Sequence, residues 1–228
     1  MTRRYALYWL PPPGSGLAAF GNAVLGYDNA AGAPVPHPQA LGDLAAVTVG
    51  ARVYGFHATL KAPMRLAPGT EEADLVAAVR DLAIGHPPVA LGPLAVAALG
   101  PFLALVPAAP PPELGLLAAE CVAVLDPWRA PLSESERAKR RPERLDPRGR
   151  TLLARWGYPY VFEAFRFHMT LTDALPDPDR AAWLRRLSDA YAATRPEPVV
   201  IDALSVLVQD GVEPFRLLAR LPFGDAHG

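Results

Sequence analysis

Two short stretches of the chain alternate between bulky apolar side chains and smaller polar ones. The first covers residues 52–62, the second covers residues 165–172, and both contain the sequence His-x-Thr-Leu. Successive side chains of a β-strand point to opposite faces, so each stretch predicts a strand with one apolar, buried face. The other face would carry His57, Thr59 and Lys61 in the first strand and Arg166, His168, Thr170 and Thr172 in the second. The repeated imidazole and hydroxyl groups indicate a functional site.

The segments that follow the two stretches predict the same order of elements. Each begins with an apolar stripe at helical spacing, over Thr70–Gly85 in the first half and Asp177–Thr194 in the second. Each then continues with two stretches typical of paired strands, which are residues 89–98 and 102–107 in the first half and residues 199–209 and 214–221 in the second. Strand, helix, strand, strand therefore occurs twice.

This repetition predicts an α+β fold with two duplicated lobes whose antiparallel sheets face a central cleft. We expect residues 1–228 to form a single bilobal domain, with lobes at about 1–125 and 151–228 joined by a basic connector at 126–150. Residues 3–10 predict a further strand, which could cross into the other lobe. A shared cleft would bring His57 and His168 opposite each other.

Composition restricts the classes of function. Hydrophobic residues make up 51% of the chain, which is ample for a packed core, and the formal net charge of −1 gives no global basic field for long nucleic acid or an anionic membrane. The single cysteine, Cys121, excludes an intramolecular disulfide framework and argues against a cysteine-based zinc site. The first apolar run is too short for a membrane span and ends at Pro11. These features favour a cytoplasmic protein, with a monomer as the default expectation.

Two imidazoles that face one cleft suit acid–base chemistry near neutral pH. One, when neutral, would remove a proton from water, and the other, when protonated, would donate a proton to a leaving alkoxide. Thr59 and Thr170 would donate hydrogen bonds to phosphoryl oxygens. Neither five-residue motif contains an acidic residue to complete a metal site, so we expect no metal and no cofactor.

The paired His-x-Thr-Leu strands resemble the two-histidine (2H) phosphoesterase superfamily. The resemblance implies a bilobal enzyme that works without metal and opens cyclic phosphodiesters, with His57 and His168 as acid and base and Thr59 and Thr170 as phosphate-binding groups. Nearly the whole chain is similar to an uncharacterised bacterial branch of this superfamily that is found with phosphonate-degradation genes. This similarity lies in residues 5–9, 54–63, 129–131, 156–161 and 165–172.

Four further residues are candidates for substrate binding. Lys61 shares the predicted site face and could neutralise phosphate, although an exposed lysine at a strand end is an equally good interpretation. Arg129 could reach the cleft from the connector, whereas Arg166 and Thr172 could bind substrate or meet only solvent and a neighbouring strand.

The expected partner is a small phosphorylated cyclic phosphodiester, such as a cyclic ribose phosphate from phosphonate breakdown. RNA ends or nucleosides with a 2′,3′-cyclic phosphate are the alternative substrates. A protein that binds a nucleotide or cyclic phosphate without turnover is the alternative class.

Overall fold

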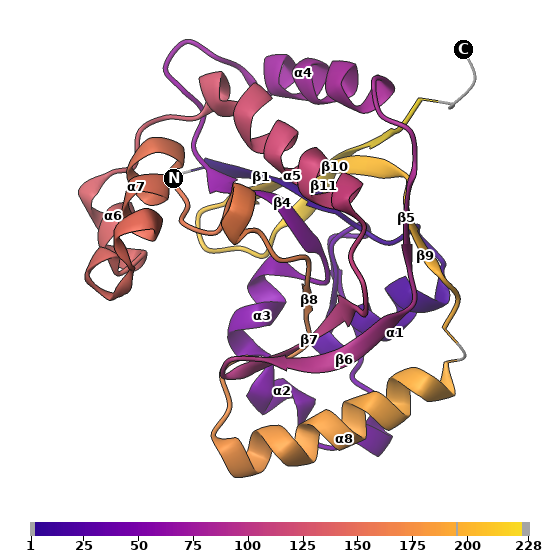
Figure 1. Cartoon of the computed structure of the whole chain (residues 1–228). Coiled ribbons are helices and arrows are strands. Elements are labelled where there is room, and N and C mark those ends of the chain that lie inside the picture. Colours follow the sequence, from indigo (N-terminus) through magenta and orange to yellow (C-terminus); the bar gives the residue numbers. More distant parts are fainter. Residues whose placement is uncertain (1–2, 195, 225–228) are drawn as a thin grey trace.

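A single seven-stranded antiparallel sheet organises the fold of this computed structural model, which describes residues 3–194 and 196–224 (Figure 1). The strands lie in the order β11-β10-β1-β4-β8-β7-β6. Their bounds are β1 Arg3–Trp9, β4 Ala58–Met64, β6 Leu94–Leu99, β7 Phe102–Pro107, β8 Met169–Thr170, β10 Ala203–Asp210 and β11 Arg216–Pro222. Two small antiparallel pairs accompany this sheet, namely β2 (Tyr27–Asp28) with β3 (Ala33–Pro34) and β5 (Val89–Gly92) with β9 (Val199–Ile201).

Helices cover the sheet and form the connector. They are α1 Gly16–Leu25, α2 Leu44–Val47, α3 Val49–Tyr54, α4 Glu72–Ile84, α5 Pro112–Val124, α6 Glu134–Lys139, α7 Pro147–Trp156 and α8 Asp177–Ala193. Short 3-10 turns occupy Gln39–Leu41, Asp126–Trp128, Pro142–Arg144 and Phe162–Ala164. No helix within the described ranges is both long and apolar enough to cross a membrane.

Local sequence explains where the main helices begin. Glu71 caps α4, and its backbone N–H donates to the carboxylate of Asp74 at 2.9 Å. Ser133 forms a capping box with Glu136 at the start of α6. The expected stripe of α4 is buried at Leu75, Val79, Leu82 and Ala83.

The apolar faces of the two motif strands enter one large core. Ala58, Leu60, Met169 and Leu171 are each at most 2% exposed and belong to this core. On the other side of the sheet, Tyr8 of the neighbouring β1 belongs to a separate small hydrophobic cluster. The alternation in the sequence therefore correctly predicts which side of each motif is buried.

Strand pairs are exchanged between the two halves of the chain. The β10–β11 hairpin of the second half pairs through β1 with the first motif strand, β4, while the β6–β7 hairpin of the first half pairs with the second motif strand, β8. Helices follow the same exchange, because α4 packs against β10 and β11 and α8 packs against β6 and β7. Figure 1 shows α4 and α8 at opposite ends of the molecule.

The α+β class with antiparallel sheets is confirmed, but the chain builds one continuous sheet where we expected a separate sheet in each lobe. Strand pairing crosses the predicted boundary between 1–125 and 151–228 in both directions. The division into two lobes and a connector stays a prediction.

Both motif strands are shorter than predicted. Residues 49–54 form α3, and Gly55, with a left-handed φ of 68°, ends this helix before β4 begins at Ala58. In the second motif only Met169 and Thr170 pair as a strand. Each catalytic candidate histidine therefore lies one position before its strand.

Candidate active site

The two motif histidines are held in the same way. His57 Nδ1 lies 2.9 Å from the carbonyl oxygen of Gly55, and His168 Nδ1 lies 2.8 Å from the carbonyl oxygen of Arg166. A carbonyl oxygen only accepts hydrogen bonds, so Nδ1 must carry the proton in each ring. In the neutral form the unprotonated nitrogen of each ring is therefore Nε2, which is the nitrogen that can accept a hydrogen bond or a proton.

Strand pairing brings the four motif residues together. Ala58 is paired with Met169 in the antiparallel β4–β8 ladder. Extending this register by one position places Thr59 opposite His168 and His57 opposite Thr170, on the face away from the main core. Residues in such opposed pairs have Cβ atoms about 5 Å apart. The hydroxyl of Thr59 also lies 3.1 Å from His57 Nε2, so Thr59 contacts one imidazole and would lie opposite the other in this extended register.

His57 is the more enclosed of the two rings. It is 9% exposed and stacks on the phenol ring of Tyr8, with ring centroids 3.7 Å apart and planes inclined by 18°. Burial lowers the pKa of His57 from 6.5 to about 4, which outweighs the opposing effect of the Gly55 carbonyl. The positive charge that His168 can carry lowers it further. His57 is therefore neutral at physiological pH.

Asn29 supports the turn that carries His57, and sequence reasoning did not identify it. This side chain is 2% exposed and donates from Nδ2 to the carbonyl oxygens of Tyr54 and Phe215, at 3.0 and 2.6 Å. A Cβ atom on Gly55 would lie 1.9 Å from Asn29 Oδ1, so this position requires glycine. No local pattern marks Asn29, because its partners lie far away in the sequence.

A cavity of about 760 Å³ opens beside the motif residues. Thr59 and His168 lie in its wall, with aromatic side chains from the start of β7 and from residues 158–165. These are Phe102, Tyr158, Tyr160, Phe162 and Phe165. Arg166 and Glu163 are the charged residues of this wall, and Glu163 is paired with Arg148.

Lys61 does not share the site face, contrary to the prediction. The β1–β4 register shifts between Thr59, which is opposite Tyr8, and Lys61, which is opposite Leu7. Tyr8 and Leu7 point to opposite faces of β1, so this irregularity turns Lys61 away from the histidines. It is 3% exposed and donates from Nζ to the carbonyl oxygen of Val122 in α5, at 2.9 Å. Burial lowers the pKa of Lys61 to about 8.

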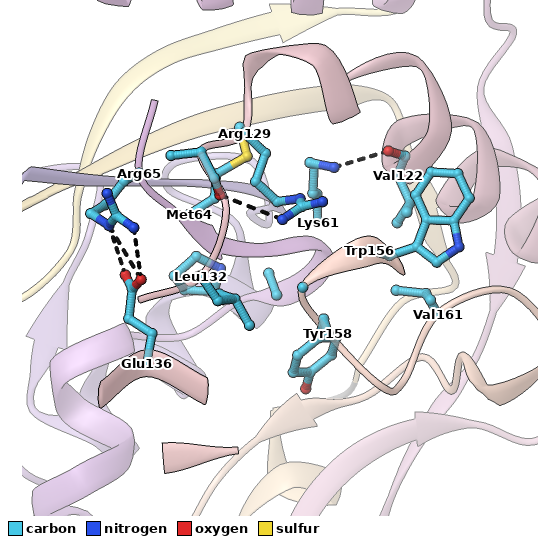
Figure 2. Close-up of a pocket in the computed structure, with 14 residues that line it drawn as sticks. Lys61, Met64, Arg65, Val122, Arg129, Leu132, Glu136, Trp156, Tyr158 and Val161 are labelled. Carbon is cyan, nitrogen blue, oxygen red and sulfur yellow. Dashed lines mark hydrogen bonds and ion pairs between the residues drawn. The ribbon is translucent and has the colours of Figure 1, made fainter. Parts of the chain in front are cut away.

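Arg129 is part of an ion-pair cluster around Asp126. The Asp126 carboxylate lies 2.8 Å from Arg129 Nε, 2.8 Å from Arg155 Nη1 and 3.7 Å from Lys61 Nζ. Lys61 and Arg129 line a second pocket, separate from the cavity beside the motifs. Figure 2 shows this pocket, with Lys61 reaching Val122 on one side and Arg65 facing Glu136 on the other. Lys61 and Arg129 already have a carboxylate partner, which weakens their case as phosphate-binding groups.

The remaining candidates differ in accessibility. Thr172 is 1% exposed, accepts a hydrogen bond from the backbone N–H of Leu103 and donates one to the carbonyl oxygen of Asp173, so its hydroxyl serves the backbone. Thr170 is half-buried, and Arg166 is exposed in the cavity wall. Within residues 3–194 and 196–224, no three His, Cys, Asp or Glu side chains converge as a metal site would require.

Two curated proteins are similar to nearly the whole chain. Both are named "Ribose 1,5-bisphosphate phosphokinase PhnN". The one from Janthinobacterium sp. (strain Marseille) is 42% identical over an alignment of 231 residues, gaps included, and the alignment covers 96% of this chain and 51% of the relative. The one from Laribacter hongkongensis (strain HLHK9) is 39% identical over 218 residues, which cover 94% of this chain and 50% of the relative. The chain spans about half the length of these relatives.

A solved structure of a conserved protein of unknown function from Agrobacterium tumefaciens str. C58 has a TM-score of 0.44 and 15% identity. The match covers 96% of this chain and 86% of that protein. A family model described as "Protein of unknown function (DUF1045)" matches residues 59–216, which include most of the sheet and the second motif. The chain belongs to the DUF1045 family.

Proposed function

We propose that this protein is a cyclic phosphodiesterase that uses His57 and His168 as base and acid. The observation that carries this proposal is the matched geometry of the two motifs. Each imidazole is fixed by the same Nδ1 hydrogen bond, and the Ala58–Met169 register, extended by one position, would place each opposite the threonine of the other motif. A site that only binds a ligand would not need two titrating groups held in this symmetrical way.

The proposed reaction needs one proton acceptor and one proton donor. A water oxygen attacks phosphorus while His57 Nε2 takes the proton of that water, and the bond from phosphorus to one ring oxygen breaks. His168 donates its proton to the departing oxygen, which leaves a phosphate monoester and a free hydroxyl. We assign the base role to His57 because burial lowers its pKa to about 4 and keeps it neutral at physiological pH.

Thr59 and Thr170 would bind the non-bridging oxygens of the phosphoryl group. The Thr59 hydroxyl lies 3.1 Å from Nε2 of His57, and neither threonine is fully buried. Negative charge accumulates on these oxygens in the transition state, where positioned donors contribute most.

The names of the relatives inform the substrate class but not the reaction. Those names describe a phosphokinase of a phosphorylated ribose. A P-loop requires a Gly-Lys step, whereas the two lysines of this chain, Lys61 and Lys139, follow Leu60 and Ala138. We therefore do not extend the kinase activity of the relatives to this chain, and infer that it acts on a related small sugar phosphate. The resemblance to the branch found with phosphonate-degradation genes favours a cyclic ribose phosphate that carries a second phosphate.

The aromatic lining of the cavity favours a second candidate substrate. Tyr160 is 57% exposed, and Phe102 lies with its ring centroid 5.7 Å from that of His168. Aromatic surfaces of this kind stack on nucleobases. Nucleosides or RNA ends with a 2′,3′-cyclic phosphate are thus the alternative to the small sugar.

The test measures kcat/KM for His57→Ala, His168→Ala and the wild type, with and without a chelator. The substrates are 5-phosphoribosyl cyclic phosphate, a nucleoside 2′,3′-cyclic phosphate and an oligonucleotide that ends in a cyclic phosphate. Each substitution should reduce turnover by about 100-fold or more, since a positioned acid or base typically contributes that much. Full activity in either variant, or loss on chelation, would overturn the mechanism. Preference for the oligonucleotide would overturn the sugar proposal.

A further inference from the structure

The cations around the site divide into paired and unpaired groups. Lys61, Arg129 and Arg155 contact Asp126, and Arg65 contacts Glu136. Among the described residues, no carboxylate lies within ion-pair distance of Arg140, whose guanidinium lies over the ring of Tyr158, 4.9 Å from its centroid. We propose that Arg140 binds a second phosphate of the substrate, an inference that rests on the proposed function.

Arg140 follows α6 as its C-cap, and the partner expected for it on that helix is already occupied. Residues four apart on a helix are neighbours, so Glu136 would normally face Arg140. Glu136 instead accepts hydrogen bonds from Arg65 at both carboxylate oxygens, with distances of 3.0 to 3.2 Å. Figure 2 shows this pair, with Arg65 directly after β4. The pairing ties α6 to the end of a motif strand and leaves the charge of Arg140 uncompensated.

Tyr158 connects Arg140 to the catalytic cavity. Its ring lies in the wall of the cavity that also contains Thr59 and His168. Gly157, with a left-handed φ of 74°, ends α7 directly before Tyr158, and a side chain there would approach the guanidinium of Arg129 within about 3.0 Å. The guanidinium of Arg140 covers one face of this ring.

The chemistry of this arrangement suits a phosphate monoester. A guanidinium stacked on an aromatic ring keeps its planar donors free at the edge, where they can bind two phosphate oxygens. Arg140 lies over Tyr158, a residue of the cavity wall that also contains Thr59 and His168, which is a place suited to a charge remote from the reacting phosphorus.

The test compares two substrates that differ in one group, a cyclic ribose phosphate with and without a phosphate monoester on its 5-hydroxyl. Arg140→Gln should lower kcat/KM for the phosphorylated compound by about 10- to 100-fold, as expected for loss of a charge-assisted hydrogen bond, and change the other compound less than about twofold. Arg137→Gln is the matched control, because Arg137 is an exposed cation on the same helix. It should leave both values unchanged. Equal losses for the two compounds in Arg140→Gln would overturn the inference.

Two further variants test the stacking platform. Tyr158→Phe keeps the ring and should retain the preference for the phosphorylated compound, whereas Tyr158→Leu should lose it. If both variants keep the preference, Arg140 does not act through Tyr158.

A binding measurement separates this inference from the proposed activity. A His57→Ala/His168→Ala double variant is titrated with the phosphorylated compound by calorimetry, with and without Arg140→Gln. Weaker binding by about 10- to 100-fold with Arg140→Gln supports the subsite even if the wild type hydrolyses neither compound. Equal binding, or no binding by the double variant, refutes it.

Discussion

Burial of His57 should make the stability of the protein depend on pH in a defined range. The pKa of this imidazole is lowered from 6.5 to about 4 in the folded chain. Between these values the unfolded chain carries a proton on His57 that the folded chain does not. The free energy of unfolding must therefore rise with pH in this range and fall as the pH is lowered from 6.5 to 4.

The expected magnitude follows from the size of the difference. Each pH unit between the two pKa values is worth about 1.4 kcal/mol. Protonation of His57 should then remove about 3 kcal/mol of stability between pH 6.5 and pH 4, a large share of the total for a typical domain. Solvent screens this effect very little, because the His57 ring is 9% exposed and stacked on Tyr8.

Urea denaturation at several pH values measures this effect. His57→Phe keeps a ring against Tyr8 but cannot be protonated, so it should lose about 3 kcal/mol less than the wild type as the pH falls from 6.5 to 4. His168→Gln is the control, since it retains His57 and should show most of the wild-type pH dependence. If His57→Phe and the wild type lose stability in parallel, His57 is not buried as described.

Three predictions concern the residues around the histidines. Thr59→Val and Thr170→Val keep the branched shape, so each should lower kcat on a cyclic phosphodiester by less than loss of a histidine, with urea midpoints close to that of the wild type; unchanged kinetics in both would assign the hydroxyls a structural role. Thr172→Val should instead lower the free energy of unfolding by about 1–3 kcal/mol, because it leaves the Leu103 N–H unpaired; a stable variant that had lost activity would restore its binding role. Asn29→Ala should reduce kcat more than it raises KM, because it frees the turn that holds the His57 carbonyl partner; loss of stability with normal kinetics in the remaining folded protein would contradict this.

Sequence patterns predicted most helices and the polar side of the two motif strands, because both depend on short-range spacing of residues. The apolar stripe of α4 is a short-range signal, and its burial is confirmed. The alternation around His57 and His168 correctly separated the core side from the polar side, because a strand of period two has only two faces.

The errors arose where long-range packing overrides the local pattern. Residues 52–54 form the last turn of α3, which ends at Gly55, and are not part of the motif strand. A shift of register between Thr59 and Lys61 turns the lysine away from the site. Arg140 was not singled out, since its importance depends on a distant Arg65 occupying Glu136.

The exchange of strands between the two halves has a consequence for the order in which the protein can fold during synthesis. When the ribosome has released the first 125 residues, β1 and β4 are present without β10 and β8, their neighbours on the outer sides. The β6–β7 hairpin likewise has no sheet to join until β8 emerges. The nascent chain therefore exposes open strand edges, which are prone to intermolecular pairing, until the second half is made. We expect a fragment of residues 1–125 to aggregate, and the complete chain to fold in one late, cooperative step.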